Sequence, residues 1–417
     1  MKLKYGKEEI QLPIEDKNII KILNLKKQKA LLNPENKLRE LLKNPIGCPS
    51  LRELIFQKKA SKILIIVNDI TRPTPYEVIL PPLLDELHQI GIKKENTIFI
   101  IATGIHRSNS PEEIKEMFGE NIVSAYKFIN HDCDDSRQKD LGNLESGNKF
   151  WVDPIVSDTD FIITTGVIVP HYFAGFSGGR KSILPGICGR KTIEANHAKM
   201  VHPNARAGNL KGNSVHEEMQ EAAEKVGVDF NINVVIDENH KIVEIVAGEL
   251  LTSWLQGVEV CKQIYICPIE KKADVVIAST GGYPKDINVY QAQKALNNAH
   301  QAVKPGGTII LLAECTEGYG EPTFEKWVEE ANSSDDIIKR LKKKFVLGGH
   351  KAYSIARVVK EVEVILISSL PQDKVRKLYF IPMENISQAT EYVKEKYGED
   401  FQAYILPSGN TVVPQLV

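Results

Sequence analysis

Histidine and lysine side chains follow directly on an apolar stretch near the middle of the sequence. Residues 161–169 (FIITTGVIV) are mostly apolar, rich in β-branched side chains and closed by a proline, a pattern that predicts a buried strand. His171 comes next, and Lys181 and His197 follow in a Gly-rich loop and a returning helical segment. Imidazole and amine groups can act as bases, nucleophiles or metal ligands, and ligands of α/β proteins bind at the carboxyl ends of strands. This stretch therefore predicts a reactive site.

Two further predicted strands are also followed by charged or imidazole side chains. Residues 62–67 lead into Asp69 and Arg72, in a loop whose direction is restricted by prolines. Residues 97–102 lead into His106, just before a strong helix start. Because the carboxyl ends of parallel strands share one edge of a sheet, we expect these side chains to form one site with those of the first stretch.

The Gly-rich loop admits three interpretations. Residues 175–179 (GFSGG) match the G-x-S-x-G pattern of serine hydrolases, with Ser177 as nucleophile, but the strand before them ends too early and no helix start follows. Residues 175–182 nearly match a nucleotide phosphate loop, but Arg180 stands where that pattern requires glycine. The loop could still bind an anion through backbone N–H groups and the charges of Arg180 and Lys181, or it could be a turn with two solvated bases.

The residues of the chain do not predict a metal site made by protein ligands alone. Residues 131–134 (HDCD) contain ligand types, but adjacent residues cannot all face one ion, so a solvated loop is the favoured interpretation. His197 alone could not hold a catalytic metal, and an organic chelator would have to supply the other ligands. Arg72 and Lys294, the latter in a predicted helix at 286–302, are candidates for binding the carboxylate of a small anion.

Length and composition place the chain among globular proteins with more than one domain. Its 417 residues exceed one ordinary core, and its pattern predicts two α/β domains, 1–268 and 273–417, joined at a short polar connection. A formal net charge of -1 offers no global field for nucleic acid or an anionic membrane, although local basic patches remain possible, and we expect neither as a partner. Six cysteines without a C-x-x-C pair, with no signal peptide and no membrane-spanning run, predict a cytoplasmic protein.

Several segments together resemble a known family. They are Asp69–Pro73 (DITRP), Thr103–Arg107 (TGIHR), Pro170–Lys181 (PHYFAGFSGGRK), Asn196–His197 and Tyr290–Lys294 (YQAQK). In this order, across almost the full length, they resemble the nickel-dependent lactate racemase family, the A protein of that system. The segment at 170–181 is long enough to exclude a chance match.

The resemblance implies two α/β domains with largely parallel sheets and the active site in the cleft between them. The N-terminal domain would carry the cofactor-attachment and catalytic residues, and the C-terminal domain would close the substrate cleft. The implied cofactor is a nickel-pincer nucleotide, a pyridinium-3-thioamide-5-thiocarboxylic acid mononucleotide that chelates nickel. Separate maturation proteins make it, so a chain produced without them would be in the apo form.

The resemblance also implies roles for residues of this chain. Lys181 would attach the cofactor covalently and His197 would bind the nickel. His106 and His171 would be the paired catalytic bases. The other implied contacts are those of Ser177, Gly178 and Arg180 with the cofactor and of Asp69, Arg72, Tyr290, Gln291 and Lys294 with the substrate.

The implied function is that of an isomerase, a racemase or epimerase of a 2-hydroxy acid. The hydroxyl proton would go to one histidine while hydride passes reversibly from the α-carbon to the cofactor. Lactate is the leading substrate, although lactate-specific members often carry histidine where this chain has Ile70. Malate, larger aliphatic or aromatic acids and sugar acids are the other substrates. A serine hydrolase using Ser177 and a non-catalytic binder of a phosphorylated anion are the alternative functions.

Overall fold

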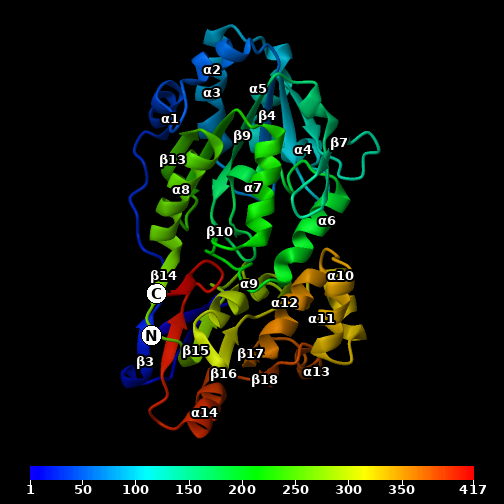
Figure 1. Ribbon diagram of the computed structural model, residues 1–417. Coiled ribbons are helices and arrows are strands. Elements are labelled where there is room, and N and C mark those ends of the chain that lie inside the picture. The colour runs from blue at the N-terminus through cyan, green and yellow to red at the C-terminus, as the bar shows by residue number, and fades with distance from the viewer. The chain divides into compact units, whose positions relative to one another are not determined.

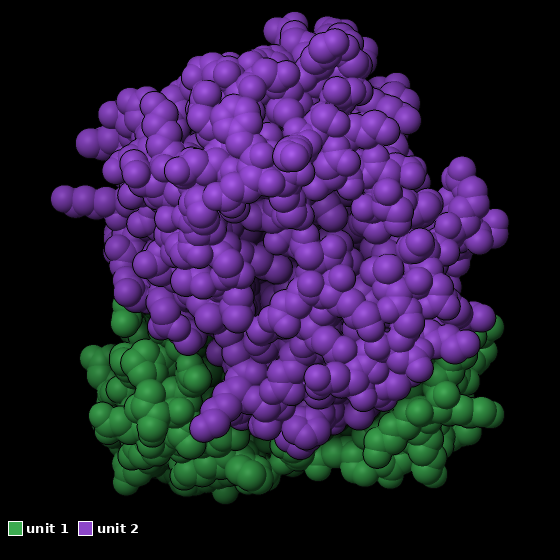
Figure 2. Space-filling view, turned by 45° about the horizontal axis from the view of Figure 1, so that its top comes forward, with its two compact units in different colours: residues 1–26, 265–417 green, residues 27–264 purple.

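The computed structural model describes residues 1–417 (Figure 1). The chain divides into two compact units. The N-terminal unit comprises residues 27–264, and the C-terminal unit comprises residues 1–26 and 265–417, coloured purple and green in Figure 2. The break after residue 264 lies close to the connection that the sequence predicts.

Residues 1–26 belong to the C-terminal unit, whereas the sequence predicted them in the N-terminal domain. β3 (Ile19–Ile22) pairs in parallel with β19 (Ala403–Leu406) at the edge of the C-terminal unit's sheet. Leu3 and Leu12 are buried in the core of the same unit. These contacts join the two ends of the chain, and no local pattern predicts them.

The N-terminal unit is built on one six-stranded sheet with the order β13-β12-β9-β4-β5-β6. Every pairing is parallel except that of the edge strand β13 with β12. The strands are β4 (Ile63–Asn68), β5 (Thr97–Ala102), β6 (Lys127–Asn130), β9 (Phe161–Ile168), β12 (Phe230–Ile236) and β13 (Ile242–Gly248).

Helices cover this sheet. Ile63, Ile65 and Val67 of β4 pack with α1 and α3 in one core, and the residues between them are also buried, as expected for a parallel strand covered on both faces. α3 continues through Pro81 and Pro82, and its apolar side packs on this core. In Figure 1 the strands run behind α7 and α8. The helices are α1 (Pro34–Lys43), α2 (Leu51–Lys58), α3 (Tyr76–Ile90), α4 (Pro111–Phe118), α5 (Glu120–Ala125), α6 (Arg190–Ala198), α7 (Ser214–Val226) and α8 (Leu250–Tyr265).

The C-terminal unit has a second six-stranded sheet with the order β18-β17-β16-β15-β19-β3, parallel throughout. One face packs on α14 and the N-terminal hairpin, and α9 contacts β15 and β16. The remaining strands of this sheet are β15 (Ala273–Ser279), β16 (Val303–Leu312), β17 (Glu363–Ile367) and β18 (Ile381–Met383). The helices are α9 (Val289–His300), α10 (Pro322–Glu330), α11 (Ser334–Lys343), α12 (Gly349–Val359), α13 (Gln372–Lys377) and α14 (Ile386–Tyr397).

Short elements complete the two units. The strand pairs are β1 (Lys2–Tyr5) with β2 (Glu8–Gln11), β7 (Lys139–Asn143) with β8 (Lys149–Val152), β10 (Pro170–His171) with β11 (Gly175–Phe176), and β14 (Ile266–Ile269) with β20 (Val413–Leu416). The 3-10 helices are η1 (Asp16–Asn18), η2 (Lys94–Asn96), η3 (Pro154–Ser157), η4 (Gly179–Ser182) and η5 (Lys199–Val201).

The carboxyl ends of β9, β4 and β5 share one edge of the N-terminal unit's sheet. β4 lies between the other two strands and pairs in parallel with both. From β4 the sheet grows through β5 to one side and through β9 to the other, so a topological switch point lies here. Asp69, His106 and His171 follow these three strand ends, which confirms the predicted common edge.

Both units are α/β structures with largely parallel sheets, which confirms the predicted fold class. The placement of the active site in a cleft between them stays a prediction. No helix of the chain combines the length and the apolar character needed to cross a lipid bilayer.

Candidate active site

His106 lies beside a buried carboxylate. Its Nδ1 is 2.6 Å from Oδ2 of Asp69, and Oδ1 of Asp69 accepts a hydrogen bond of 2.6 Å from the Thr71 hydroxyl. Burial by itself would raise the pKa of the Asp69 carboxyl, but the hydrogen bonds from His106 and Thr71 outweigh it, and the pKa lies below its ordinary value. Because an ionised carboxylate can only accept, Nδ1 of His106 donates and its Nε2 is left as an acceptor.

The buried ring of Phe173 connects three predicted site residues. Its centroid is 4.6 Å from that of His171 and 5.0 Å from that of His197, both in edge-to-face contact. Nζ of Lys181 lies 5.7 Å from the same centroid. The structure therefore brings together the residues that the sequence placed at a strand end, in a loop and on a returning helix.

Positive groups surround His171 and Lys181. Burial lowers the pKa of His171 well below its ordinary value, and the charges of Lys181 and Arg72 lower it further. Burial also lowers the pKa of Lys181, and Arg72 and Arg180 add to the effect. The charged groups that act on these two pKa values are all positive. The site thus favours a neutral imidazole, a neutral amine and an anionic ligand.

The two candidate bases therefore have neighbours of opposite charge. His106 follows β5 and faces a carboxylate, whereas His171 follows β9 and faces cations. The two strands lie on opposite sides of β4. Nδ1 of His171 accepts a hydrogen bond of 3.3 Å from the backbone N–H of Ala174, so the neutral ring carries its hydrogen on Nε2.

Arg180 holds the Gly-rich loop from inside. Its NH1 and NH2 groups donate to the carbonyl oxygens of residues 174, 176 and 178, and its Nε donates to His216 over 2.9 Å. The guanidinium also stacks on Trp254, 3.9 Å from the ring centroid. This differs from the predicted contact with a cofactor, because the buried guanidinium is committed to the loop and acts on the site through its charge.

The hydroxyl of Ser177 also forms its hydrogen bonds with the backbone. Its hydroxyl accepts from the Val169 N–H over 2.9 Å and donates to the Val167 carbonyl over 2.7 Å, and the residue is 4% exposed. The structure thus differs from the predicted contact of Ser177 with the cofactor. A nucleophilic serine needs an adjacent base and an open position, so this geometry also contradicts the hydrolase alternative.

Two backbone N–H groups that the anion-binding interpretation of the loop would use are bonded within the protein. The N–H of Gly179 donates to Asn233 over 2.8 Å, and the N–H of Lys181 donates to the carbonyl of Gly178. Gly178 has a φ of +76, and a Cβ there would lie 3.0 Å from Asn233 and Ile168. Gly178 is therefore required by the tight turn, and no anion contact is needed to explain it.

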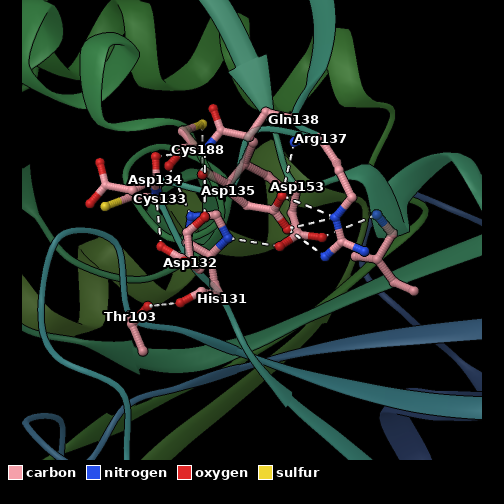
Figure 3. A network of polar contacts seen from close by, with 12 residues as sticks. Thr103, His131, Asp132, Cys133, Asp134, Asp135, Arg137, Gln138, Asp153 and Cys188 are labelled. Carbon is pink, nitrogen blue, oxygen red and sulfur yellow. Dashed lines mark hydrogen bonds and ion pairs between the residues drawn. The ribbon is translucent and has the colours of Figure 1, made fainter.

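His131 is a buried core residue. Figure 3 shows its ring between two acceptors, with Nδ1 2.8 Å from Asp153 and Nε2 2.9 Å from the carbonyl oxygen of Cys188. These contacts tie the end of β6 to the start of η3 and to the segment after η4. His131 therefore has a structural role.

The acidic residues after His131 are poor metal ligands. Ligand atoms of Asp132, Cys133 and Asp134 lie within 4.8 Å of one another. Both carboxylate oxygens of Asp134, however, are 2.7 Å from Arg190, and burial raises the pKa of the Cys133 thiol to about 11. An arginine-paired carboxylate and a protonated thiol bind cations weakly, so no metal site is inferred here.

The other predicted substrate residues lie on α9 in the C-terminal unit. Nζ of Lys294 donates to the side chain of Gln291 over 3.0 Å. Tyr290 packs against Lys351, whose Nζ lies 3.8 Å from the ring centroid and donates to the Tyr290 carbonyl over 2.5 Å. Burial and then the charge of Glu321 raise the pKa of Tyr290 to about 12. The contact of these residues with substrate stays a prediction.

The chain matches known proteins along its length. Residues 5–208 match the family model of the lactate racemase N-terminal domain, and residues 269–414 match that of the lactate racemase C-terminal domain. Curated lactate racemases from Thermoanaerobacterium thermosaccharolyticum and Lactiplantibacillus plantarum are 36% and 34% identical to it, each over 99% of this chain and 98% of the relative. This chain belongs to the lactate racemase family. It is an isomerase of the racemase type, as the sequence predicted.

Solved structures agree with the membership in the lactate racemase family. The lactate racemase apoprotein from Thermoanaerobacterium thermosaccharolyticum superposes with a TM-score of 0.91 at 34% identity, over 100% of this chain and 99% of that one. A protein from Thermotoga maritima superposes with a TM-score of 0.64 at 22% identity, over 94% of this chain and 100% of that one, and shares the fold.

The structure adds residues to the site of this lactate racemase family member that the sequence did not single out. Thr71 and Phe173 lie inside the recognised motifs, and their positions between reactive residues were a usable signal. Lys351 is different, because it lies far along the chain and only its burial against Tyr290 reveals it. Its place in the site stays a prediction, like that of Tyr290.

In this lactate racemase family member, Asp69→Asn is expected to lower kcat about 10²–10⁴-fold. An amide can present either its oxygen or its NH2 group to Nδ1 of His106, so Nε2 is no longer fixed as the acceptor. The pKa of Asp69 is lowered in the folded chain, so the carboxylate is ionised at neutral and alkaline pH. Its contribution to stability is present above the unfolded pKa of about 3.9 and is lost only as pH falls through the folded pKa. The loss of activity should therefore be similar across neutral and alkaline pH. Racemisation rates measure it, with the exposed Asp132→Asn as control, and an unchanged kcat in Asp69→Asn would contradict the role.

Ser177→Ala is expected to cost about 1–3 kcal/mol of unfolding free energy, because the Val169 N–H and the Val167 carbonyl lose the hydroxyl as a hydrogen-bond partner. Racemase activity should change little in the folded variant. A fluorophosphonate probe should label neither protein. Labelling of the wild type that disappears in Ser177→Ala would restore the hydrolase interpretation.

Gly179→Ala is expected to destabilise the N-terminal unit by about 2–5 kcal/mol, the sum of backbone strain and overpacking. Its φ is +51, and a Cβ would lie 2.8 Å from the indole ring of Trp254. Gly227→Ala is the control, since it has a φ of +80 with nothing within 4 Å. It should lose only the strain term, about 1–2 kcal/mol. Denaturant unfolding followed by circular dichroism measures both, and equal losses would contradict the packing argument.

Proposed function

We propose that this protein interconverts the enantiomers of a 2-hydroxy acid, with lactate as the leading substrate. The observation that carries the proposal is the pair His106 and His171, which follow strands on opposite sides of β4 and have surroundings of opposite charge. A racemase of this kind needs two such groups, because one takes the hydroxyl proton from one enantiomer and the other gives a proton to the hydroxyl of the opposite enantiomer. The names of the relatives support lactate. Malate and sugar acids are the other candidate substrates.

The two histidines would take the hydroxyl protons of opposite enantiomers. His106 is set as a base, because Asp69 holds its Nδ1–H and leaves Nε2 to accept. His171 would accept at Nε2 after its hydrogen moves to Nδ1. The hydrogen bond from Ala174 that opposes this change is long, at 3.3 Å, and therefore weak.

The proposed cofactor is a nickel-pincer nucleotide, and the N-terminal unit has the residues to hold it. Burial and nearby charges hold the amine of Lys181 toward its neutral, nucleophilic form, which covalent attachment requires. His197 lies against the same Phe173 ring and would supply the protein's nickel ligand. The charges of Arg72 and Arg180 suit a ligand with a phosphate. When bound, the cofactor would supply the acceptor for hydride from the substrate α-carbon.

Arg72 would bind the substrate carboxylate. It follows β4, between the strands that carry the two bases, and its NH1 donates to the Thr71 hydroxyl over 3.0 Å, which links it to Asp69. A guanidinium offers a planar pair of donors to a carboxylate. Tyr290, Gln291 and Lys294 are the proposed substrate contacts of the C-terminal unit.

Enantiomer interconversion by the nickel-loaded protein tests the proposal. The chain would be produced together with cofactor-maturation proteins, and its nickel content and intact mass measured before assay. Single enantiomers of lactate, malate and a sugar acid would then be followed by chiral chromatography. The double variant His106→Gln/His171→Gln, loaded in the same way, is the control for contaminating activity. Nickel-loaded protein that racemises none of these acids would contradict the proposal.

A further inference from the structure

Helix α7 holds each of the elements that carry the proposed cofactor residues. Asn213, its N-cap residue, donates to the backbone of the β10–β11 hairpin, and His216 accepts from η4. Glu218 accepts from α6. The hairpin carries His171, η4 carries Lys181 and α6 carries His197. One helix thus sets the relative positions of these three elements.

Glu218 is the buried carboxylate of this helix. It is 4% exposed, and its two oxygens accept three hydrogen bonds. Oε1 accepts from Nζ of Lys199 over 2.7 Å and from the Ser146 hydroxyl. Oε2 accepts from Nδ2 of Asn196 over 2.8 Å. As an acceptor without hydrogens, this carboxylate dictates which end of the Asn196 amide faces it.

The orientation of Asn196 determines the tautomer of its neighbour His197. Asn196 is fully buried, and its Nδ2 donates to Glu218 and to the carbonyl of Val215, the latter over 3.2 Å. Its Oδ1 therefore faces Nδ1 of His197, at 3.2 Å. Because an amide oxygen can only accept, Nδ1 of His197 carries the hydrogen, and Nε2 has the lone pair that metal coordination uses.

We propose that Glu218 is a positioning residue for His197, acting through Asn196 to keep the ring in the Nδ1–H tautomer that can bind nickel at Nε2. The nickel part of this inference rests on the proposed function. Metal-binding histidines generally have their other ring N–H held by a carboxylate or a carbonyl. Here the amide oxygen of Asn196 accepts that N–H, and the carboxylate of Glu218 fixes the orientation of the amide. Lys199 and Ser146 keep that carboxylate in place.

The tautomer of His197 can be read without nickel. ¹⁵N NMR of the histidine-labelled full chain, with His197→Gln used to assign the signal, should show the Nδ1–H form in the wild type. Glu218→Met removes the acceptor at similar size and should give a mixture with the Nε2–H form. Glu218→Gln is the second variant, should Met impair folding, and is expected to shift the same way but less. Glu217→Gln, an exposed neighbour on the same helix, should keep the wild-type signal.

Nickel retention is the second readout, measured on the cofactor-loaded protein. Loss of such a supporting group typically weakens metal binding about 10–100-fold, and we expect Glu218→Met to release nickel to a chelator correspondingly faster. Glu217→Gln should retain nickel as the wild type does.

Two results would overturn the inference. One is a wild-type His197 in the Nε2–H form, and the other is an unchanged tautomer and unchanged nickel retention in folded Glu218 variants. Failure of the proposed function looks different, because a chain that never takes up nickel would still show the tautomer change. In that case the positioning of His197 by Glu218 stands and the nickel assignment falls.

Discussion

Lys181→Arg is expected to abolish the covalent cofactor adduct and to reduce racemase activity to background while the chain stays folded. Arginine is a basic side chain of similar reach, but its guanidinium does not form the bond that an amine forms. The wild-type amine is prepared for that bond, because burial and then the charges of Arg72 and Arg180 hold the pKa of Lys181 well below its ordinary value. Intact mass and nickel content of protein made with maturation proteins measure the effect.

Lys211→Arg is the matched control for this experiment. Lys211 is exposed and lies in the same unit, on the segment between α6 and α7. This variant should carry the adduct and keep its activity. An adduct that persists in Lys181→Arg would show that the attachment site has been assigned wrongly.

His106→Gln and His171→Gln are each expected to lower kcat for racemisation about 10²–10⁴-fold, with a smaller change in KM. The two histidines follow strands on opposite sides of β4, so we expect each variant to lose the proton transfer on one face of the substrate. Burial and nearby cations hold the pKa of His171 well below its ordinary range, which keeps its imidazole neutral and able to accept.

Single-turnover experiments with pure enantiomers distinguish the two roles. Loaded His106→Gln should still convert to the 2-oxo acid the enantiomer that His171 deprotonates, and loaded His171→Gln should convert the other one. The two variants thus serve as controls for each other. If both variants fail with the same enantiomer, the assignment of one histidine to each face is wrong.

The strands around the site were predictable because their signals are local. β4, β5 and β9 are apolar runs closed by glycine, proline or polar residues, and the reactive residue types stand directly after them. In contrast, the roles of Arg180 and Ser177 were not predictable. Whether a guanidinium or a hydroxyl points into a site depends on its contacts with other segments. Here Arg180 contacts Trp254 and His216, and the Ser177 hydroxyl bonds to the backbone of Val167 and Val169.

The sequence by itself determined the α/β class, the reactive residues and their place at strand ends, since periodicity and motif spacing are properties of neighbouring residues. Tertiary structure alone decided that β5 and β9 flank β4, which puts His106 and His171 on opposite sides. It also decided that residues 1–26 join the C-terminal unit and that Glu218 reaches His197 through Asn196. Strand order, burial and hydrogen-bond partners are set by contacts between distant parts of the chain, and these contacts also shift the pKa values on which the proposed chemistry depends.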